Sequence, residues 1–411
     1  MRSACRPRGP LSALPPFLAS LVLSACSGPS EPPSGPPAPA GPEPAALAVP
    51  GPDASAALKS LTDDYFQAYL ETNPIAATAI GDNRYNDRLP NGFDPAIRAE
   101  RKAEAQAFLD RALEIDRAAL APDEQITYDV FVHGRRQAIE DAAWPSHLLP
   151  LSQFFSMPTF MAQLGSGQSL QPFATPEDYR NWLSRLEDYL VINDQMISNM
   201  REGLEQGLVQ PRVLMEKALP QLDALAVENV EDSVFLAPVR NIPDTVPEEE
   251  RAALEAEYRT FVAERLLPAF RTLRDFVATE YLPATRETVA WTALPGGDAW
   301  YEHQVRKQTT TDLSAAEIHA LGLEEVARLL DEMRAVKDDV GFDGDLAAFF
   351  DFLSSDPRFQ FESEEAAIQA YEDIRSKVTA ALPAVFEIFP NATYEIRPVE
   401  AFRAASSSGA S

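Results

Sequence analysis

The sequence predicts a mainly α-helical protein: one large domain of long amphipathic helices, with at most one or two short strands near the C-terminus. Apolar residues recur at spacings of three and four over most of residues 53–389, which is the period of a helix with one buried side. Helix-start signals are frequent, for example Thr175-Pro176 and the capping box from Ser314 to Glu317. Alternation of the strand type is found only at Thr393–Val399.

The N-terminus has the pattern of a secretion signal that ends at a cysteine. Three arginines within residues 1–8 precede the apolar run Leu11–Leu23, which is too short to span a bilayer. The run leads into Leu23-Ser24-Ala25-Cys26, which resembles a bacterial lipobox, where the cysteine receives lipid and the signal is cut just before it. The alternative is an ordinary secretory signal with an incidental cysteine. We expect residues 1–25 to be a lipoprotein signal peptide and Cys26 to be lipidated.

Residues 26–52 are predicted to form a proline-rich tether that begins at the lipidated cysteine. Ten prolines occur among residues 27–52, and proline at that density prevents regular helices and sheets. Lipid on Cys26 predicts a lipid bilayer as partner and the bacterial cell envelope as location. Ser27, rather than Asp, after the cysteine favours the outer membrane, facing the periplasm. The formal net charge of −28 repels phosphate backbones, so nucleic acid is not an expected partner.

The helical domain is predicted over residues 53–411. We expect a first helix that stops at Asn73-Pro74 and a long one that runs from Thr175-Pro176 to Gly207. Residues 144–172 are rich in Pro, Gly, Ser and aromatic residues, which is typical of a functional or covering loop. Further helices are expected at 74–81, 97–115, 122–140, 315–336, 346–353 and 363–389. One more begins at 211 and is kinked or broken at Pro220, and another begins at 247 and is bent by Pro268.

Rare residue types gather in the stretch Leu294–Leu330. Pro295-Gly296-Gly297 predicts a turn, and a short aromatic and basic segment, 300–308, follows it. The helix after Ser314 carries an apolar stripe that we expect to be buried, formed by Ile318, Leu321, Val326, Leu329, Met333 and Val336.

Candidate residues for a substrate cleft are Tyr301, His303, Arg306 and Arg397. Histidine titrates near neutrality and serves as acid, base or ligand, and arginine can bind a carboxylate. For His303 a surface histidine in a turn is an equally good interpretation, and solvated charges are the commoner one for the arginines. His319 is expected to be structural. Asp129 and His133, four residues apart on one helix, could supply two metal ligands, although an exposed polar pair is the favoured interpretation.

Several common catalytic motifs are absent. The sequence contains no H-E-x-x-H, no S-x-x-K, no complete G-x-S-x-G, no P-loop and no G-x-G-x-x-G. We therefore assign no catalytic or metal-ligating residue to this chain from local motifs.

Two motifs together resemble a bacterial lipoprotein family, domain-of-unknown-function family 885. The first runs from Asn73 to Pro90, and the second comprises the glycine turn before Tyr301, the threonines at 309–311 and the segment Ser314–Leu323. Residues 341–344 and 394–398 fit segments that follow. The resemblance covers residues 58–402. The family is similar to zinc peptidases, and the resemblance therefore implies a largely helical fold.

The resemblance implies that the family's zinc site, a His-Glu motif followed by Pro-Gly-His, lies in a part of the family sequence that follows the segment matched by residues 394–398. We expect zinc only for a full-length member and no cofactor bound by the 411 residues. The chain is then interpreted as a truncated or frameshifted product, or an incomplete gene model, of an envelope-anchored metallopeptidase-like lipoprotein acting on a peptide substrate. The 411 residues alone would be inactive as a zinc hydrolase. The alternative is a non-catalytic helical scaffold or interaction lipoprotein, so whether the chain is an enzyme stays open.

Overall fold

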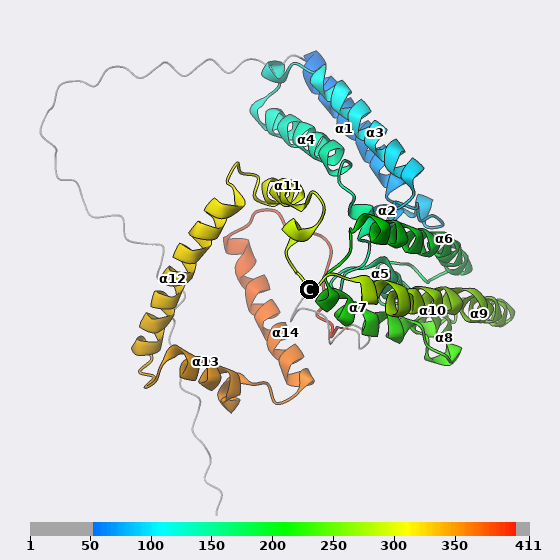
Figure 1. Cartoon of the computed structure of the whole chain (residues 1–411). Coiled ribbons are helices and arrows are strands. Elements are labelled where there is room, and N and C mark those ends of the chain that lie inside the picture. The colour runs from blue at the N-terminus through cyan, green and yellow to red at the C-terminus, as the bar shows by residue number, and fades with distance from the viewer. Residues whose placement is uncertain (1–51, 400–411) are drawn as a thin grey trace, which may run out of the picture. The chain divides into compact units, whose positions relative to one another are not determined.

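The computed structural model describes residues 52–399, and these are mainly helical, as the sequence predicts (Figure 1). The predicted signal peptide, Cys26 and nearly all of the tether lie outside the described residues. The α-helices are α1 (Pro52–Thr72), α2 (Pro74–Ala79), α3 (Pro95–Leu113), α4 (Pro122–Asp141), α5 (Met157–Leu164), α6 (Pro176–Gln206), α7 (Arg212–Leu225), α8 (Ala237–Arg240), α9 (Glu248–Phe261), α10 (Leu267–Phe276), α11 (Gly297–Thr309), α12 (Ala315–Asp339), α13 (Leu346–Ser355) and α14 (Glu364–Ala381).

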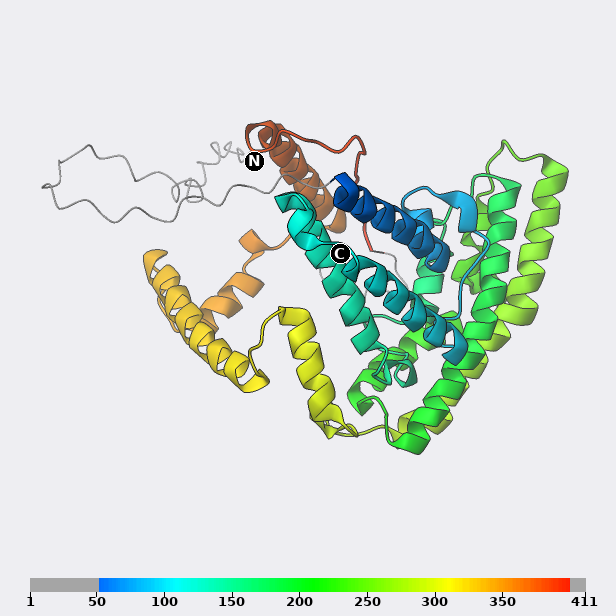
Figure 2. The ribbon, with the colours of Figure 1, turned by 90° about the horizontal axis from the view of Figure 1, so that it is seen from above.

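Helices α1, α3 and α4 form one packed group with its own apolar core (Figures 1 and 2). Tyr65 of α1 is central to it, because its ring lies edge-on to Phe108 of α3 and to Phe131 of α4, with centroids 5.3 and 5.2 Å away. Edge-to-face contacts of this kind add about 0.5–1.5 kcal/mol to the effect of burial alone. The group places α3 and α4 side by side, and the candidate sites described below lie against these two helices.

The largest core surrounds α6, which packs against α9 and α10. Thr175 accepts from the backbone N–H of Asp178 at its start, and Gly207 ends it in the left-handed conformation with φ of 71°. Both ends therefore fall where the local sequence predicts them. Short π-helical segments, Val262–Leu266 and Val277–Tyr281, flank α10.

The segment from Asn73 to Pro90 is held on α6 by two side chains. Arg185 is fully buried, and its guanidinium group donates to the carbonyl oxygens of Pro74, Tyr85 and Arg88. One turn further along α6, a carboxylate oxygen of Asp188 accepts from the backbone N–H of Leu89 over 2.8 Å. The segment Asn73–Pro90, the first of the two motifs named above, thus surrounds a buried cation with backbone carbonyl oxygens.

The stripe on α12 is the main point where the structure differs from the sequence-based prediction. None of its six members is buried, and Val326 and Val336 are each more than half exposed. Helices α12, α13 and α14 together bury only Phe349 among the residues described for them. The periodicity correctly predicted the helix, but the prediction that its apolar side is buried was wrong as far as the described residues show.

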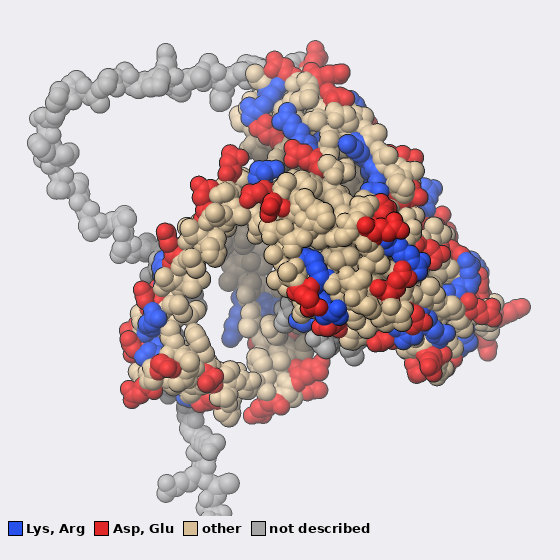
Figure 3. All heavy atoms as spheres, viewed as in Figure 1, with Lys and Arg blue, Asp and Glu red and all other residues tan. Residues whose placement is uncertain are grey.

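The strand expected at Thr393–Val399 is also absent, since these residues have no regular secondary structure. An isolated strand has no ladder partners to satisfy its backbone N–H and C=O groups, and no strand lies in the part of the chain that the structure describes. Among residues 52–399, no helix combines the length and the apolar character needed to cross a bilayer. Acidic and basic side chains are interspersed over the face seen in Figure 3.

Candidate functional site

Helix α11 carries three of the four predicted cleft residues and begins where the glycine turn places it. Gly296 adopts φ of 67°, the left-handed region that favours glycine. Gly297 has no room for a side chain, because a Cβ there would lie 2.1 Å from the carbonyl oxygen of Trp291. The Pro-Gly-Gly sequence thus permits the short helix η9 (Trp291–Ala293) to pack directly on the first turn of α11.

His303 is buried in α11 and contacts two carboxylates at the end of α4. Its Nε2 lies 2.7 Å from Oδ1 of Asp141, the last residue of α4, and only 3% of the residue is exposed. Lys307, one turn along α11, donates from Nζ to the other oxygen of Asp141 over 2.7 Å. A carboxylate of Glu140 lies 3.8 Å from His303 Nδ1. One carboxylate therefore connects two side chains of α11 to the end of α4.

Aromatic rings enclose the imidazole. The rings of Trp144 and Trp300 stack with centroids 5.9 Å apart and planes 6° from parallel, and Trp144 also stacks on His303 with centroids 5.5 Å apart. Trp291 meets Trp300 edge-on at 5.0 Å. The cluster encloses one side of the imidazole, and the hydrogen bond between His303 and Asp141 is stronger where water is excluded.

A cavity of about 260 Å³ opens beside this pair, between α4 and the C-terminal end of α11. Arg136 of α4 and Arg306 of α11 line it, and neither has a carboxylate within salt-bridge distance among the described residues. His303 and Lys307 also line it, as do the two acidic residues Glu140 and Asp312. Carboxylate binding by Arg306, one of its two interpretations from the sequence, therefore stays a prediction.

The four predicted cleft residues are brought together only in part. His303 and Arg306 line the same cavity, whereas Tyr301, which is 40% exposed, does not line it. Arg397 pairs with Glu395 and donates to the carbonyl oxygen of Gln168 at 3.5 Å. Histidine 303 is not a surface residue of a turn, so that interpretation was wrong: it is a buried residue within a helix.

The remaining histidines show no metal-ligating arrangement. Asp129, considered with His133 as a ligand pair, is instead bound in two hydrogen bonds by Arg117. This contact lowers the pKa of Asp129. His319 is exposed on α12. Within residues 52–399, no group of three or more His, Cys, Asp or Glu side chains is placed to hold a metal ion. We assign no zinc-dependent step to these residues.

Sequence reasoning missed Asp141 as a member of the site. It is 162 residues from His303 in the chain, and it is one of 63 acidic residues. Its position at the end of α4, just before the loop that carries Trp144, was the only local signal that could have identified it.

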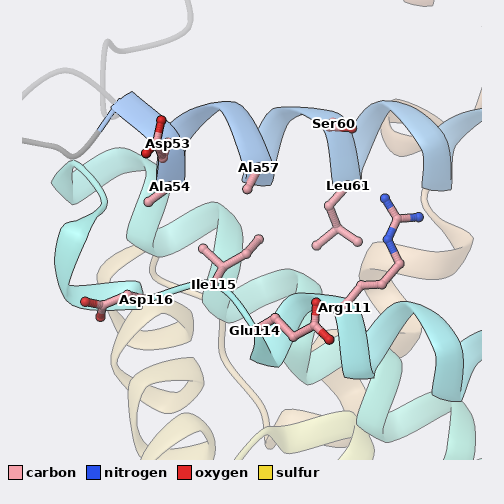
Figure 4. A pocket seen from close by; sticks show the side chains of 9 residues that line it. All are labelled: Asp53, Ala54, Ala57, Ser60, Leu61, Arg111, Glu114, Ile115 and Asp116. Carbon is pink, nitrogen blue, oxygen red and sulfur yellow. The ribbon is translucent and has the colours of Figure 1, made fainter.

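A larger groove of about 490 Å³ lies between α1 and the end of α3 (Figure 4). Leu61 and Ile115 form its floor, and both belong to the apolar core of this helical group. Arg111, the basic residue in its lining, is already paired with Asp64 at 2.7 Å. The groove therefore offers an apolar floor rimmed by carboxylates, without a free cation or a histidine in its lining.

Comparison with known proteins agrees with this fold. A crystal structure described as that of "the putative lipoprotein from Colwellia psychrerythraea" is similar, with a TM-score of 0.72 and 19% sequence identity. The similarity covers 87% of this chain and 63% of that one, so the chain spans less than two thirds of the length of the solved protein. No curated protein sequence matches this chain significantly. The family model for bacterial proteins of unknown function, DUF885, matches residues 74–411. This chain therefore belongs to the DUF885 family.

Proposed function

We propose that this protein is a lipid-anchored component of the bacterial cell envelope, held at the outer membrane through Cys26. The lipobox-like sequence Leu23–Cys26 and the proline-rich tether support the anchor. The description of the Colwellia protein as a lipoprotein supports it independently.

The anchor can be tested with the two cysteines of the chain. Metabolic labelling with a fatty acid and fractionation of membranes should show label on the wild-type protein and none on Cys26→Ala. Cys5→Ala is the matched control, since the predicted cleavage removes Cys5. Labelling that survives in Cys26→Ala would contradict the lipid anchor.

We further propose that residues 52–399 form the substrate-facing helical part of a larger protein with zinc-dependent peptidase-like activity. The observation that carries this proposal is the apolar surface of α12–α14. On α12, Val326, Leu329, Met333 and Val336 are between 42% and 55% exposed. On α14, Tyr371, Ile374 and Val378 form a second apolar row at helical spacing.

Apolar rows of this length are expected to be covered in a stable protein. Complete burial of one large aliphatic side chain contributes about 1.5–3 kcal/mol, so covering the row on α12 would add several kcal/mol of stability that its contacts with the described residues do not provide. Ion pairs also form along α12, where Arg328 contacts Glu325 and Glu332 over 2.7 and 2.6 Å. The helix thus combines surface ion pairs with an exposed apolar row that has no cover among the described residues.

The solved relative suggests which partner this is, because 37% of its length has no counterpart here. We propose that further residues of the family fold cover α12–α14 and bring the metal ligands with them. Arg306 and Tyr301 would then contact a peptide substrate, with Arg397 as a further candidate. The alternative is a non-catalytic scaffold, in which a separate protein binds the same apolar surface.

A comparison of two proteins distinguishes these functions. The first is the 411-residue chain, and the second continues in frame through the coding DNA beyond the codon for Ser411. For the longer protein we expect stoichiometric zinc, peptide hydrolysis that a chelator abolishes, and weaker binding of a dye that reports exposed apolar surface. A stop codon directly after Ser411, with a monomeric and cooperatively folded 411-residue product, would contradict the peptidase proposal and favour the scaffold.

A further inference from the structure

A second cavity, of about 240 Å³, lies between α3, α4 and the residues that follow α4. It is separate from the cavity beside Arg306, although Asp141 lies between the two. The charged and polar residues that line it are Arg98, Arg101, Lys102, Asp141, Ser146 and His147.

Its three cations stand on one side of a single helix. Arg98, Arg101 and Lys102 are at positions i, i+3 and i+4 of α3, which are neighbours on a helix surface. Like charges at these spacings repel each other and destabilise a helix. None of the three has a carboxylate within 4.0 Å among the described residues, although most other arginines of this acidic chain do have one. A bound anion would remove the repulsion.

The contacts of the two arginines hold their guanidinium groups in place without neutralising them. Arg98 donates from Nη1 to Nδ1 of His147 over 2.8 Å, and Arg101 donates from Nη2 to the carbonyl oxygen of Thr72 over 3.2 Å. Nε of Arg98 is enclosed and has no hydrogen-bond partner in the described structure. The charge of Arg98 is therefore less hydrated than that of a surface arginine, which increases its attraction for an anion.

His147 contributes a neutral donor. Arginine has no acceptor, so Nδ1 of His147 must be the unprotonated nitrogen that receives the hydrogen bond, and the ring proton lies on Nε2. Burial, together with the charge of Arg98, lowers the pKa of His147, while Glu202 acts in the opposite direction. The hydroxyl group of Ser146 is a further donor in the lining.

The acidic residue in the lining does not neutralise this group. Both oxygens of Asp141 are already engaged, one by His303 and the other by Lys307. Glu202 affects His147 but does not line the cavity. The cavity is thus lined by three cations and two neutral hydrogen-bond donors. Its one acidic residue, Asp141, is already paired with Lys307.

We propose that this cavity binds the oxyanion group, a carboxylate or a phosphoryl group, of a small organic molecule. Charge-assisted hydrogen bonds from arginine suit both groups, and the planar guanidinium can bind either of them with two parallel bonds. The indole of Trp144 also lines the cavity and offers an apolar wall for the rest of the molecule. This inference does not depend on the proposed peptidase function, because it concerns binding alone.

The test is isothermal titration calorimetry on the 411-residue protein in detergent. Inorganic phosphate is the titrant in one series and succinate in the other. Sodium chloride at equal ionic strength is the control for screening. We expect saturable binding of at least one anion and none of chloride. In Arg101→Gln/Lys102→Gln we expect binding to weaken about tenfold or more, since a charge-assisted hydrogen bond contributes about 1.5–3 kcal/mol.

The matched control is Lys217→Gln, which removes an exposed lysine of α7 that does not line the cavity and has no carboxylate within 4.0 Å among the described residues. It should bind as the wild type does. If the double variant does not fold, Lys102→Gln alone serves, because Lys102 is exposed. Binding of phosphate alone or succinate alone supports the site and identifies its oxyanion. Absence of saturable binding of either, equal loss in Lys217→Gln, or no loss in the cavity variants overturns the proposal.

Discussion

The guanidinium group of Arg185 donates a 2.7 Å hydrogen bond to the hydroxyl oxygen of Thr78, across 107 residues of sequence. Gln171 accepts a second bond from the same group over 2.5 Å. Burial lowers the pKa of Arg185 to about 10, so the side chain remains charged at neutral pH. A cation in the core is therefore surrounded by uncharged oxygens, several of them from the segment Asn73–Pro90.

Arg185→Met should destabilise the protein strongly, on the order of 3 kcal/mol or more, because several buried acceptors would lose their donor at once. Urea unfolding followed by circular dichroism measures the change. Arg180→Met is the matched control, since Arg180 lies on the same helix in a half-exposed pair with Glu250, and such a pair contributes about 1 kcal/mol or less. Similar losses in the two variants would contradict a special role for Arg185.

Asp141→Asn should lower the unfolding free energy by about 1–3 kcal/mol, because it weakens the contacts to His303 and Lys307 together. The carboxylate is about one third exposed, which places the expected value toward the lower end. Glu140→Gln is the control, because its carboxylate is 3.8 Å from His303 and 64% exposed, and we expect less than about 0.5 kcal/mol. Thermal melts at fixed ionic strength compare the two, and a larger effect of Glu140→Gln would be inconsistent with the geometry.

NMR titration should give His147 a pKa below the ordinary value of 6.5, with the resonance assigned by its loss in His147→Gln. Arg98→Gln should raise that pKa, since it removes the neighbouring positive charge. The unfolded state binds the proton more readily than the folded state does. The contribution of His147 to stability is therefore complete above pH 6.5 and decreases as the pH falls through and below that value. A pKa at or above 6.5 in the wild type would be incompatible with its burial beside Arg98.

Val326→Glu should change the unfolding free energy of the 411-residue chain by less than about 0.5 kcal/mol, because Val326 is 55% exposed. The same variant should reduce the binding of a dye that reports exposed apolar surface. Leu222→Glu is the contrasting control: this residue is 2% exposed in the main core, and the cost should be several kcal/mol. A large loss of stability in Val326→Glu would mean that α12 is already covered in solution.

Features that depend on a few neighbouring residues were predictable from the sequence. The caps at Thr175 and Ser314, and the left-handed glycine at 207, are local signals, and the structure has each where it was expected. The glycine turn at 296–297 was equally clear. Local rules of this kind need no knowledge of what lies across the fold.

Pairing across the fold was not predictable. Helical periodicity identifies an apolar side but not what covers it, and the stripe on α12 has no cover among the described residues. The alternation at Thr393–Val399 likewise needs a partner strand before it becomes a strand. The contact of His303 with Asp141, and the gathering of Arg98 with His147, depend on how α3, α4 and α11 pack together. One sequence offers no signal for such pairs.

The tryptophan stack gives the protein an optical signal of its own. Trp144, Trp291 and Trp300 are three of its four tryptophans; the ring of Trp300 contacts both of the others, and Trp144 also stacks on His303. Trp182, the fourth, belongs to the separate core around α6. A ligand that shifts α11 would therefore change the near-ultraviolet circular dichroism of the stacked indoles while the signal of Trp182 stays constant. Binding in the cavity beside Arg306 or in the cavity beside Arg98 can thus be followed in the unlabelled protein.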